Sequence, residues 1–458
     1  MDRAALTDTM KKDNPELFEK TPVLKAVMTL VIPTVISQMI TVVYNMADTF
    51  FIGQMNDPDQ VAAATLVMPP FVMLTGFANI FGIGGASLIS RSLGMGDREK
   101  ASQCAAFSIW TSAGVALVYG ILIFSLRSAI FPFLGANDAT YGYCTDYVLW
   151  TIGIGSVPTV LSACLAHLVR SEGYSKEASF GVAFGGILNM LLDPLFIFGL
   201  HMGVIGAAAA TMLSNTAALL YFVILLRKNR ESSVIGFSPS RYPRGLAIPR
   251  EILLVGLPSF IMNMMSILSN TVLNRMVVSY SNQAIAGMGI AKKIDMLAFA
   301  IAGGMTQGVL PLIGYNYASG NRERMRSVIR TAFRCSLTAA AVGTLFLFTC
   351  AVPVVKAFID DPATVEFGQH FLRIVSLSCP ALSVTMMTIS IFQATGSKRT
   401  PMFLSMLRKG GLDIPFMFIM NSIAGAYGIP WATPIADFLA MAFSLAFFIP
   451  YWRKLDVR

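Results

Sequence analysis

The sequence predicts an all-α integral membrane protein with about twelve transmembrane helices arranged as two pseudo-symmetric six-helix bundles. The chain of 458 residues is 55% hydrophobic and only 13% charged, whereas soluble domains carry about 25% charged residues. Its apolar runs reach the roughly 20 residues that a helix needs to cross hydrocarbon. Motifs of the first half also return in the second half. These three observations exclude a soluble enzyme with a large core.

The apolar segments are interpreted as helices because an open strand cannot satisfy its backbone hydrogen bonds in lipid. Their length and flanking turn residues set the boundaries. In chain order, the expected spans are 24–53, 61–90, 101–126, 143–168, 178–199, 203–226, 251–280, 284–314, 327–355, 370–395, 401–422 and 428–452.

Three pairs of motifs, each separated by about 225 residues, indicate an internal repeat. An even number of helices in each half keeps both halves in the same orientation, so an axis along the membrane normal should relate the two bundles. The paired motifs are Pro33–Asn45 with Pro258–Asn270, Gly96–Lys100 with Gly320–Arg324, and Gly203–Ala208 with Gly428–Ala432.

The net charge of +9 comes from basic residues in alternate loops, which is the bias of cytoplasmic loops. The chain is therefore expected in the cell inner (plasma) membrane with both termini cytoplasmic, and nucleic-acid binding is not needed to explain the charge. The polar start lacks the pattern of a cleavable signal. The expected domains are an N-terminal tail (1–23), an N lobe (24–226), a cytoplasmic linker (227–250), a C lobe (251–452) and a C-terminal tail (453–458).

Two isolated acids mark the candidate functional site. Asp193 is the only formally charged residue between Ala178 and Leu226, and Asp48 is alone between Lys25 and Asp57. A carboxylate at such depth costs roughly 3 kcal/mol to insert, so it is a functional-site hypothesis by default.

Polar neighbours could complete a cation site around these acids. Asn189 lies four residues before Asp193 and so shares its helix face, while Pro194 removes a helix hydrogen bond and frees a carbonyl oxygen. Thr211 on the next helix could add a hydroxyl. The alternatives are that the threonine bonds to its own helix and that the asparagine bridges helices.

Burial disfavours the charged form of a carboxyl group, and a nearby second carboxyl disfavours it further. Such a site could bind a proton, or hold Na⁺ with both acids ionised, and these residues do not choose between the two. The first helix can also kink at Pro33, which lacks a backbone donor.

The chain resembles the multidrug and toxic compound extrusion (MATE) family over nearly its whole length. The motifs that carry the resemblance are Asn45–Gly53, Gly173–Lys176, Leu188–Pro194 and Gly206–Thr211. The likeness is greatest to the DNA-damage-inducible-like branch. The resemblance implies that Asp48, Asn189, Asp193 and Thr211 form the cation-coupling site, with Pro33 as a hinge that bends when the site is loaded.

The second half departs from the Na⁺-coupled branch of that family, because 260–268 and 376–393 carry no acid. Lys292 and Asp295 are three residues apart and can form an ion pair, or they can contact substrate. Met265 and Met288 are candidates for the same substrate cavity, since methionine adapts to varied shapes. Asp413 and Asp437 could attract a cationic substrate, or pair with Arg408 or Lys409.

We therefore expect an antiporter, driven by H⁺ or Na⁺ and without a cofactor, that exports amphipathic and often cationic organic compounds by alternating access. Lipids and small molecules are its expected partners, and a monomer its expected state. The alternative within the superfamily is a flippase for lipid-linked oligosaccharides or a solute uptake carrier. A membrane enzyme or receptor is disfavoured because the sequence has no P-loop, zinc motif or nucleophile motif.

Overall fold

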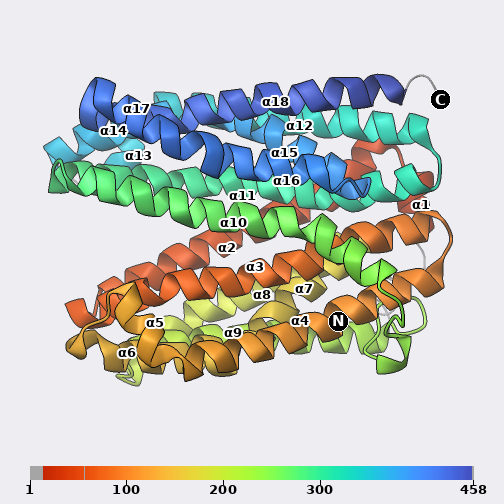
Figure 1. Cartoon of the computed structure of the whole chain (residues 1–458), viewed down its shortest axis with the longest axis horizontal. Coiled ribbons are helices and arrows are strands. Elements are labelled where there is room, and N and C mark those ends of the chain that lie inside the picture. Colours follow the sequence, from red (N-terminus) through yellow and green to blue (C-terminus); the bar gives the residue numbers. More distant parts are fainter. Residues whose placement is uncertain (1–13, 56, 360, 456–458) are drawn as a thin grey trace, which may run out of the picture.

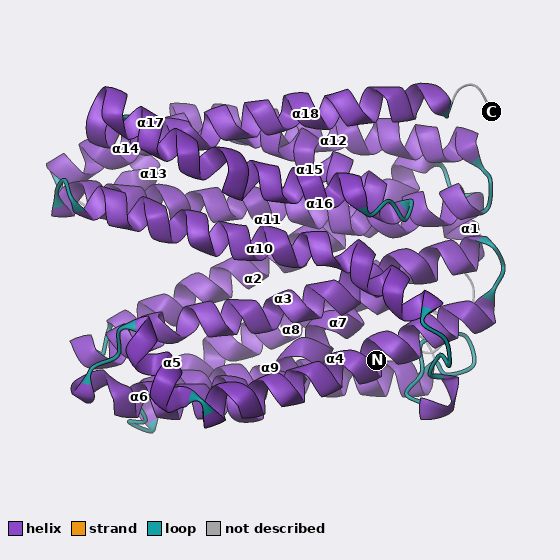
Figure 2. Ribbon diagram, in the orientation of Figure 1, coloured by secondary structure: helices purple, strands orange, loops and turns teal. Residues whose placement is uncertain are grey.

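The computed structural model describes residues 14–55, 57–359 and 361–455, and these consist of helices and loops without a strand (Figure 2). Nine of the described helices are long and apolar enough to cross a membrane, or up to eleven spans if each of two bent helix pairs counts as one. The remaining expected span, 401–422, is also helical, but three charges in its middle lower its hydropathy. The predicted all-α membrane fold is confirmed.

Helices of the first half form one lobe (Figure 1). They are α2 (Val23–Gly53), α3 (Pro58–Gly94), α4 (Arg98–Ser125), α5 (Arg127–Leu134), α6 (Asp138–Val148), α7 (Ser156–Ser171), α8 (Ser175–Pro194) and α9 (Val204–Lys228), with π-helical turns η1 (Leu149–Ile154) and η2 (Leu195–Gly199).

Helices of the second half form the other lobe (Figure 1). They are α10 (Ala247–Val278), α11 (Asn282–Ala318), α12 (Arg322–Thr349), α13 (Ala351–Lys356), α14 (Pro362–Ser376), α15 (Cys379–Ala394), α16 (Arg399–Met406), α17 (Ile414–Ala424) and α18 (Ala432–Lys454), with the π-helical turn η4 (Leu407–Asp413) and the 3₁₀ turns η5 (Gly425–Tyr427) and η6 (Ile429–Trp431).

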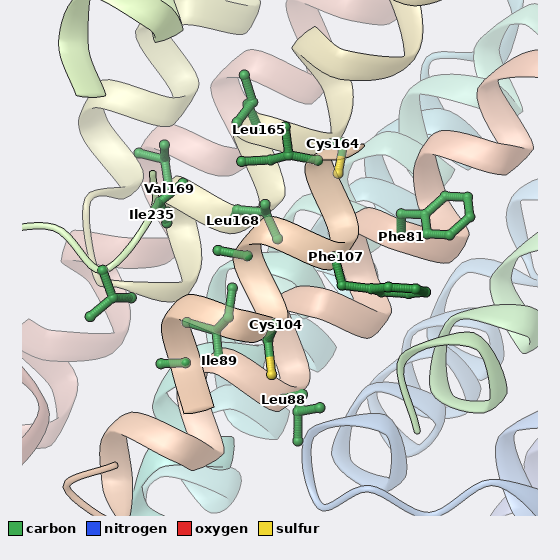
Figure 3. Packing of buried hydrophobic residues seen from close by; sticks show 14 of the residues in the cluster. Phe81, Leu88, Ile89, Cys104, Phe107, Cys164, Leu165, Leu168, Val169 and Ile235 are labelled. Atoms are coloured by element: carbon green, nitrogen blue, oxygen red, sulfur yellow. The ribbon is translucent and has the colours of Figure 1, made fainter. Parts of the chain in front are cut away.

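Each lobe is packed by small and aliphatic side chains at its helix crossings. In the N lobe, Leu88 and Ile89 of α3 meet Cys104 of α4 and the Leu165–Val169 segment of α7 (Figure 3). Small residues let helix backbones approach closely where lipid supplies no hydrophobic drive for association. Two of the six cysteines, Cys104 and Cys164, lie in this cluster as free, buried packing residues.

A short helix before the first span docks on the opposite lobe. In α1 (Asn14–Glu19), the ring of Phe18 stacks on Tyr315 of α11 with 4.8 Å between centroids. The Arg324 side chain donates a 2.6 Å hydrogen bond to the Phe18 carbonyl oxygen. The start of the chain is thus attached to the C lobe. The rest of the two expected tails, 1–13 and 456–458, lies outside the described residues.

The segment between the lobes is packed against the N lobe. Val234 and Ile235 are buried in the core of that lobe. The Glu172 carboxylate, in the turn after α7, accepts hydrogen bonds of 2.6 Å from the Ser233 hydroxyl and 2.6 Å from the Val234 amide. The short 3₁₀ turn η3 (Pro239–Arg241) lies in the same segment. This linker crosses between lobes at the end of the molecule that holds the basic loops.

We call that end the basic end; its loops are 95–97, 172–174, 229–246, 319–321 and 395–398. The two lobes touch in the half nearest to it. A Cβ atom added to Gly84 of α3 would overlap the carbonyl oxygen of Ile252 on α10, and one added to Gly256 would overlap that of Ile80. Two glycines facing two carbonyl groups therefore set the closest approach of the lobes.

A second contact joins α2 to α11 in the same half. A Cβ atom on Gly308 would lie 2.9 Å from the carbonyl oxygen of Leu30, and one on Gly304 would lie 2.6 Å from the Cα of Val35. Towards the opposite end the ribbons of the two lobes diverge (Figure 1). The lobes are therefore joined at the basic end.

We predict that Gly256→Ala destabilises the protein by about 1–3 kcal/mol, the usual cost of forcing a methyl group into a packed contact. Thermal unfolding of the purified protein in detergent measures this. Gly343→Ala on α12 is the matched control, because a Cβ atom there meets nothing within 4 Å. Equal unfolding temperatures for the two variants would contradict the proposed contact.

We also predict that Glu172→Ala releases the linker, since it removes both hydrogen-bond acceptors. Glu172→Gln should retain the linker, because an amide can accept from Val234 and donate to Ser233. Limited trypsin digestion at Arg241 and Arg244 measures release. Cleavage of Glu172→Ala at the wild-type rate would show that burial of Val234 and Ile235 alone holds the segment.

Burial raises the pKa of Glu172 from 4.5 to about 7, although its hydrogen bonds to Ser233 and Val234 oppose this shift. The docked state therefore binds more protons than the released state between these two values. It follows that docking loses stability as the pH rises from about 4.5 through about 7. The digestion rate relative to that of the Glu172→Gln protein, whose amide does not titrate and so corrects for the pH dependence of trypsin, should rise as the pH passes through about 7.

Candidate functional site

The candidate cation site lies where α2, α8 and α9 converge, in the half of the N lobe away from the basic end. Two glycines, placed one turn before Asn189, allow this convergence. A Cβ atom on Gly186 would lie 2.9 Å from the Tyr44 ring of α2, and one on Gly185 would lie 3.1 Å from the Cβ of Ala218 on α9. Both contacts bring neighbouring backbones close to the polar face of α8.

The predicted polar residues meet there. The Asn189 amide nitrogen donates hydrogen bonds of 3.3 Å to Oδ1 of Asp193 and 3.3 Å to Oγ1 of Thr211. Asn189 is 1% exposed and Asp193 is fully buried. The Asp48 carboxyl lies within electrostatic range of the Asp193 carboxyl. The four residues come from three helices and form one cluster.

Three oxygen atoms of this cluster lack a partner. Oδ1 of Asp48, Oδ1 of Asn189 and Oδ2 of Asp193 are buried and accept no hydrogen bond from the described part of the chain. A buried acceptor without a partner costs about 1–3 kcal/mol. A proton, cation or water molecule from outside the protein chain would offset this cost by interacting with these oxygens.

Two neighbouring acids in a medium of low polarity cannot both stay ionised without a compensating cation. The cluster can therefore share a proton, or use its carboxylate, amide and hydroxyl oxygens to hold Na⁺. A group of three or more His, Cys, Asp or Glu side chains suited to a metal ion is absent from the described residues. The oxygen-rich set with two acids is suited to a monovalent ion.

The proline after Asp193 coincides with a change of helix type. The α-helix α8 ends at Pro194 and continues as the π-helical turn η2. A proline cannot donate to the carbonyl four residues earlier, here that of Met190. The wider turn thus begins directly after the predicted ligands, and this agrees with the loosened turn that the sequence predicts.

Pro33 lies inside α2, which is continuous from Val23 to Gly53. Its position is between Leu30 and Val35, whose backbone atoms face Gly308 and Gly304 of α11. Asp48 is on the same helix, fifteen residues later. One helix therefore carries the candidate hinge, part of the lobe contact and one of the two acids.

Two tyrosines that sequence reasoning missed also face the site. The hydroxyl groups of Tyr44 and Tyr147 lie within electrostatic range of both Asp48 and Asp193. Tyr44 is four residues before Asp48, so helical spacing could have revealed it. Tyr147 comes from α6, and no local pattern connects it to the acids.

Of the four residues expected in a substrate cavity, two form the predicted ion pair, and the two methionines pack against the protein. Met288 is 2% exposed and packs in the hydrophobic core of the C lobe. The sulfur of Met265 instead lies over Gly410, where an added Cβ would be 2.6 Å from it. The Lys292 ammonium is 3.8 Å from Asp295 and donates to Thr433 at 3.4 Å.

The other two acids of the C lobe are paired with bases. Asp437 accepts hydrogen bonds of 2.6 Å and 3.2 Å from the Arg408 guanidinium. The Asp413 carboxylate accepts a 3.1 Å hydrogen bond from Lys409. Of the two interpretations open from the sequence, the structure supports pairing within the protein.

A two-lobed helical membrane protein with a buried, unsatisfied acid pair in one lobe is a membrane transporter rather than an enzyme. The model of the MatE family matches residues 33–195 and 258–419, so the chain belongs to this family. The two matched segments begin at Pro33 and Pro258, which confirms the internal repeat. The match identifies the family and leaves the branch a prediction from the sequence.

Relatives of known name extend along almost the whole chain. The multidrug export protein MepA of Staphylococcus aureus (strain N315) is 31% identical over 430 residues, covering 94% of each chain. MepA of Staphylococcus haemolyticus (strain JCSC1435) is 31% identical over 443 residues, covering 96% of each.

Solved structures share the fold. One is described as the outward-facing conformation of a multidrug resistance MATE family transporter of the MOP superfamily. It has a TM-score of 0.91 and 23% identity, covering 97% of this chain and 99% of the other. A MATE in complex with MaD3S is equally similar, with a TM-score of 0.91 and 23% identity.

We predict that Thr211→Val lowers stability by about 1–3 kcal/mol, because it removes the acceptor of an Asn189 donor. Thr216→Val on the same helix is the control, since the Thr216 hydroxyl donates to the carbonyl oxygen of Met212 in its own helix. Thermal unfolding in detergent should separate the two variants. Equal losses of stability in the two variants would contradict the prediction, because the hydrogen bond between helices would then contribute no more than the one within a helix.

Proposed function

We propose that this protein is a cation-coupled antiporter that exports amphipathic, often cationic, organic compounds by alternating access, with H⁺ or Na⁺ as the coupling ion. The observation that carries the proposal is the acid pair of Asp48 and Asp193, with oxygens of both left unpartnered in the N lobe. The multidrug export role of the MepA relatives supports the class of cargo. The protein works as a monomer surrounded by lipid and needs no cofactor.

The basic end faces the cytoplasm in this proposal, because cytoplasmic loops of inner-membrane proteins are enriched in lysine and arginine. The described start and end of the chain, α1 and the last turn of α18, lie at that end (Figure 1). Since the close lobe contacts lie near that end, the proposed cycle assigns the described arrangement to the outward-facing state. In this state a cation from outside can reach the site and a bound compound can leave.

Helix α2 provides the physical link between cation and lobes. A cation or proton bound between Asp48 and Asp193 removes their repulsion and draws α2 towards α8. The hinge at Pro33 allows the outer part of α2 to move while the segment near Leu30 stays packed on Gly308 of α11. This movement of α2 alters how the N lobe holds the compound, which then leaves outwards.

The cycle closes when the lobes exchange their contacts and the site opens to the cytoplasm. Release of the cation there restores the acid pair, and a new compound binds. Coupling requires only that cation and compound favour different states of the same chain. No soluble domain or nucleotide site takes part.

The flippase alternative would need several cations in one cavity to receive a pyrophosphate group. Its three candidate bases do not supply them. Lys292 is beside Asp295, while Lys293 and Arg275 are exposed. The arrangement favours a cargo without a strongly anionic head.

We predict that Asp48→Asn abolishes active efflux and leaves folding intact, because the amide cannot exchange a proton or balance a cation. Dye efflux from proteoliposomes, with pH and Na⁺ gradients imposed separately, measures this and identifies the ion. The control is Asp57→Asn, which removes an acid at the start of α3, just beyond the membrane span that carries Asp48. Full efflux by the Asp48→Asn protein would refute the assigned role.

A further inference from the structure

The C lobe contains a buried polar site that the proposed function does not use. The Asp413 carboxylate is 1% exposed and accepts three hydrogen bonds. They come from Ser269 of α10 at 2.6 Å, from Lys409 of η4 at 3.1 Å and from Thr433 of α18 at 3.3 Å. We call these four residues the Asp413 site.

This arrangement repeats the candidate cation site of the N lobe. Lys409 and Asp413 are four residues apart, like Asn189 and Asp193, and each aspartate is followed within two residues by a proline. Asn189 and Asp193 lie just before the π-helical turn η2, whereas Lys409 and Asp413 lie within the π-helical turn η4. A threonine of the next long helix completes each set.

The spacing of the two sets agrees with the internal repeat. Asn189, Asp193 and Thr211 precede Lys409, Asp413 and Thr433 by about 220 residues, close to the repeat of about 225. Helix α10, which supplies Ser269, stands in the C lobe where α2 stands in the N lobe, since the family model matches from Pro33 and again from Pro258. The two sites are therefore counterparts.

Two substitutions distinguish the counterparts. Lysine stands at position 409 where the N lobe has the neutral Asn189. The repeat places Leu273 opposite Asp48, so the second acid is missing, and α10 offers only the Ser269 hydroxyl. The N-lobe site has two acids and no base, whereas the Asp413 site has one acid and one base.

The other charges at the site balance one another. Arg408 is paired with Asp437 at 2.6 Å. Lys292 donates to Thr433 at 3.4 Å and lies 3.8 Å from Asp295, so Asp295 balances this second base. The Lys409 side chain is only 11% exposed, and Met265 covers the adjoining Gly410. The Lys409 ammonium is thus held against Asp413 away from bulk water.

We propose that the Asp413 site is a monovalent-cation site whose cation is the Lys409 ammonium, tethered to the chain and present in every state. The inference rests on the proposed function, because the Asp413 site is interpreted from the ion-binding role proposed for its N-lobe counterpart. Its consequence is that, of these two counterpart sites, only the one in the N lobe exchanges its ion. Removal of the lysine should convert the Asp413 site into a second one that accepts Na⁺.

The test uses the full-length protein carrying Asp48→Asn and Asp193→Asn, so that the N-lobe site cannot respond. Lys409→Asn is added to this background, which restores the residue types of the N-lobe pair. Thermal unfolding in detergent is followed as Na⁺ replaces choline at constant ionic strength. Only the variant with Lys409→Asn should be stabilised, by roughly 1.5 °C at ten times the dissociation constant.

Three further variants in the same background are the controls. Lys293→Asn removes a lysine from an exposed position of α11 and should give no response to Na⁺. Lys409→Arg keeps a tethered cation and should give none either. Lys409→Asn combined with Asp413→Asn removes both charges and should abolish the response to Na⁺. If Lys409→Asn alone is unstable, this double variant should also restore the fold.

A Lys409→Asn protein that folds and ignores Na⁺ would overturn the proposal. So would a response that survives Asp413→Asn, because the ion would then bind elsewhere. If Lys409→Asn alone fails to fold in choline, purification in Na⁺ must rescue it, and failure of that rescue counts against the proposal. Since the N-lobe acids are absent throughout, these results do not depend on whether the N-lobe site drives efflux.

Discussion

The structure depends on one constraint, which is that a carboxylate surrounded by apolar helices must be neutralised. Asp437 meets it through Arg408, and Asp413 meets it through Lys409. Asp48 and Asp193 have no base beside them, and both retain an oxygen without a partner. Their neutralisation therefore has to come from outside the chain, and this requirement makes the N-lobe site able to sense a proton or cation concentration.

The need to neutralise the acids can affect the contact between the lobes, because α2 carries Asp48 and also packs against the C lobe. Near one end it carries Asp48 against α8, and nearer the other it packs through Leu30 and Val35 against the glycines of α11. Pro33 lies within the second contact. If α2 is stiff, a change in the distance between the two acids also affects the contact between the lobes. The missing backbone donor of Pro33 places the bend at this contact instead of within the site.

Much of this architecture was predictable from the sequence because it follows from local patterns. Apolar length gave the spans, the repeated motifs gave two lobes, and the isolated positions of Asp48 and Asp193 marked the site. The contribution of Tyr147 was not predictable, since only tertiary packing brings α6 to the acids. The same holds for Met288, expected in a cavity and found in the core, and for the linker, whose Val234 and Ile235 are too few to form a pattern but are buried by the N lobe.

The internal repeat also explains why the two lobes need not behave alike. Duplication provides two equivalent sites, but a lysine in place of a neutral asparagine adds a positive charge to one of them. In our proposal the tethered ammonium cannot be exchanged, so the C lobe keeps α10, η4 and α18 in one arrangement, whereas the N lobe would alternate between states with and without its ion. An antiporter in which only one lobe responds to the ion avoids half-loaded states, because no second site can fill independently of the first. On this argument the difference in charge between the two sites, rather than any difference in fold, determines which lobe responds to the ion and which stays fixed.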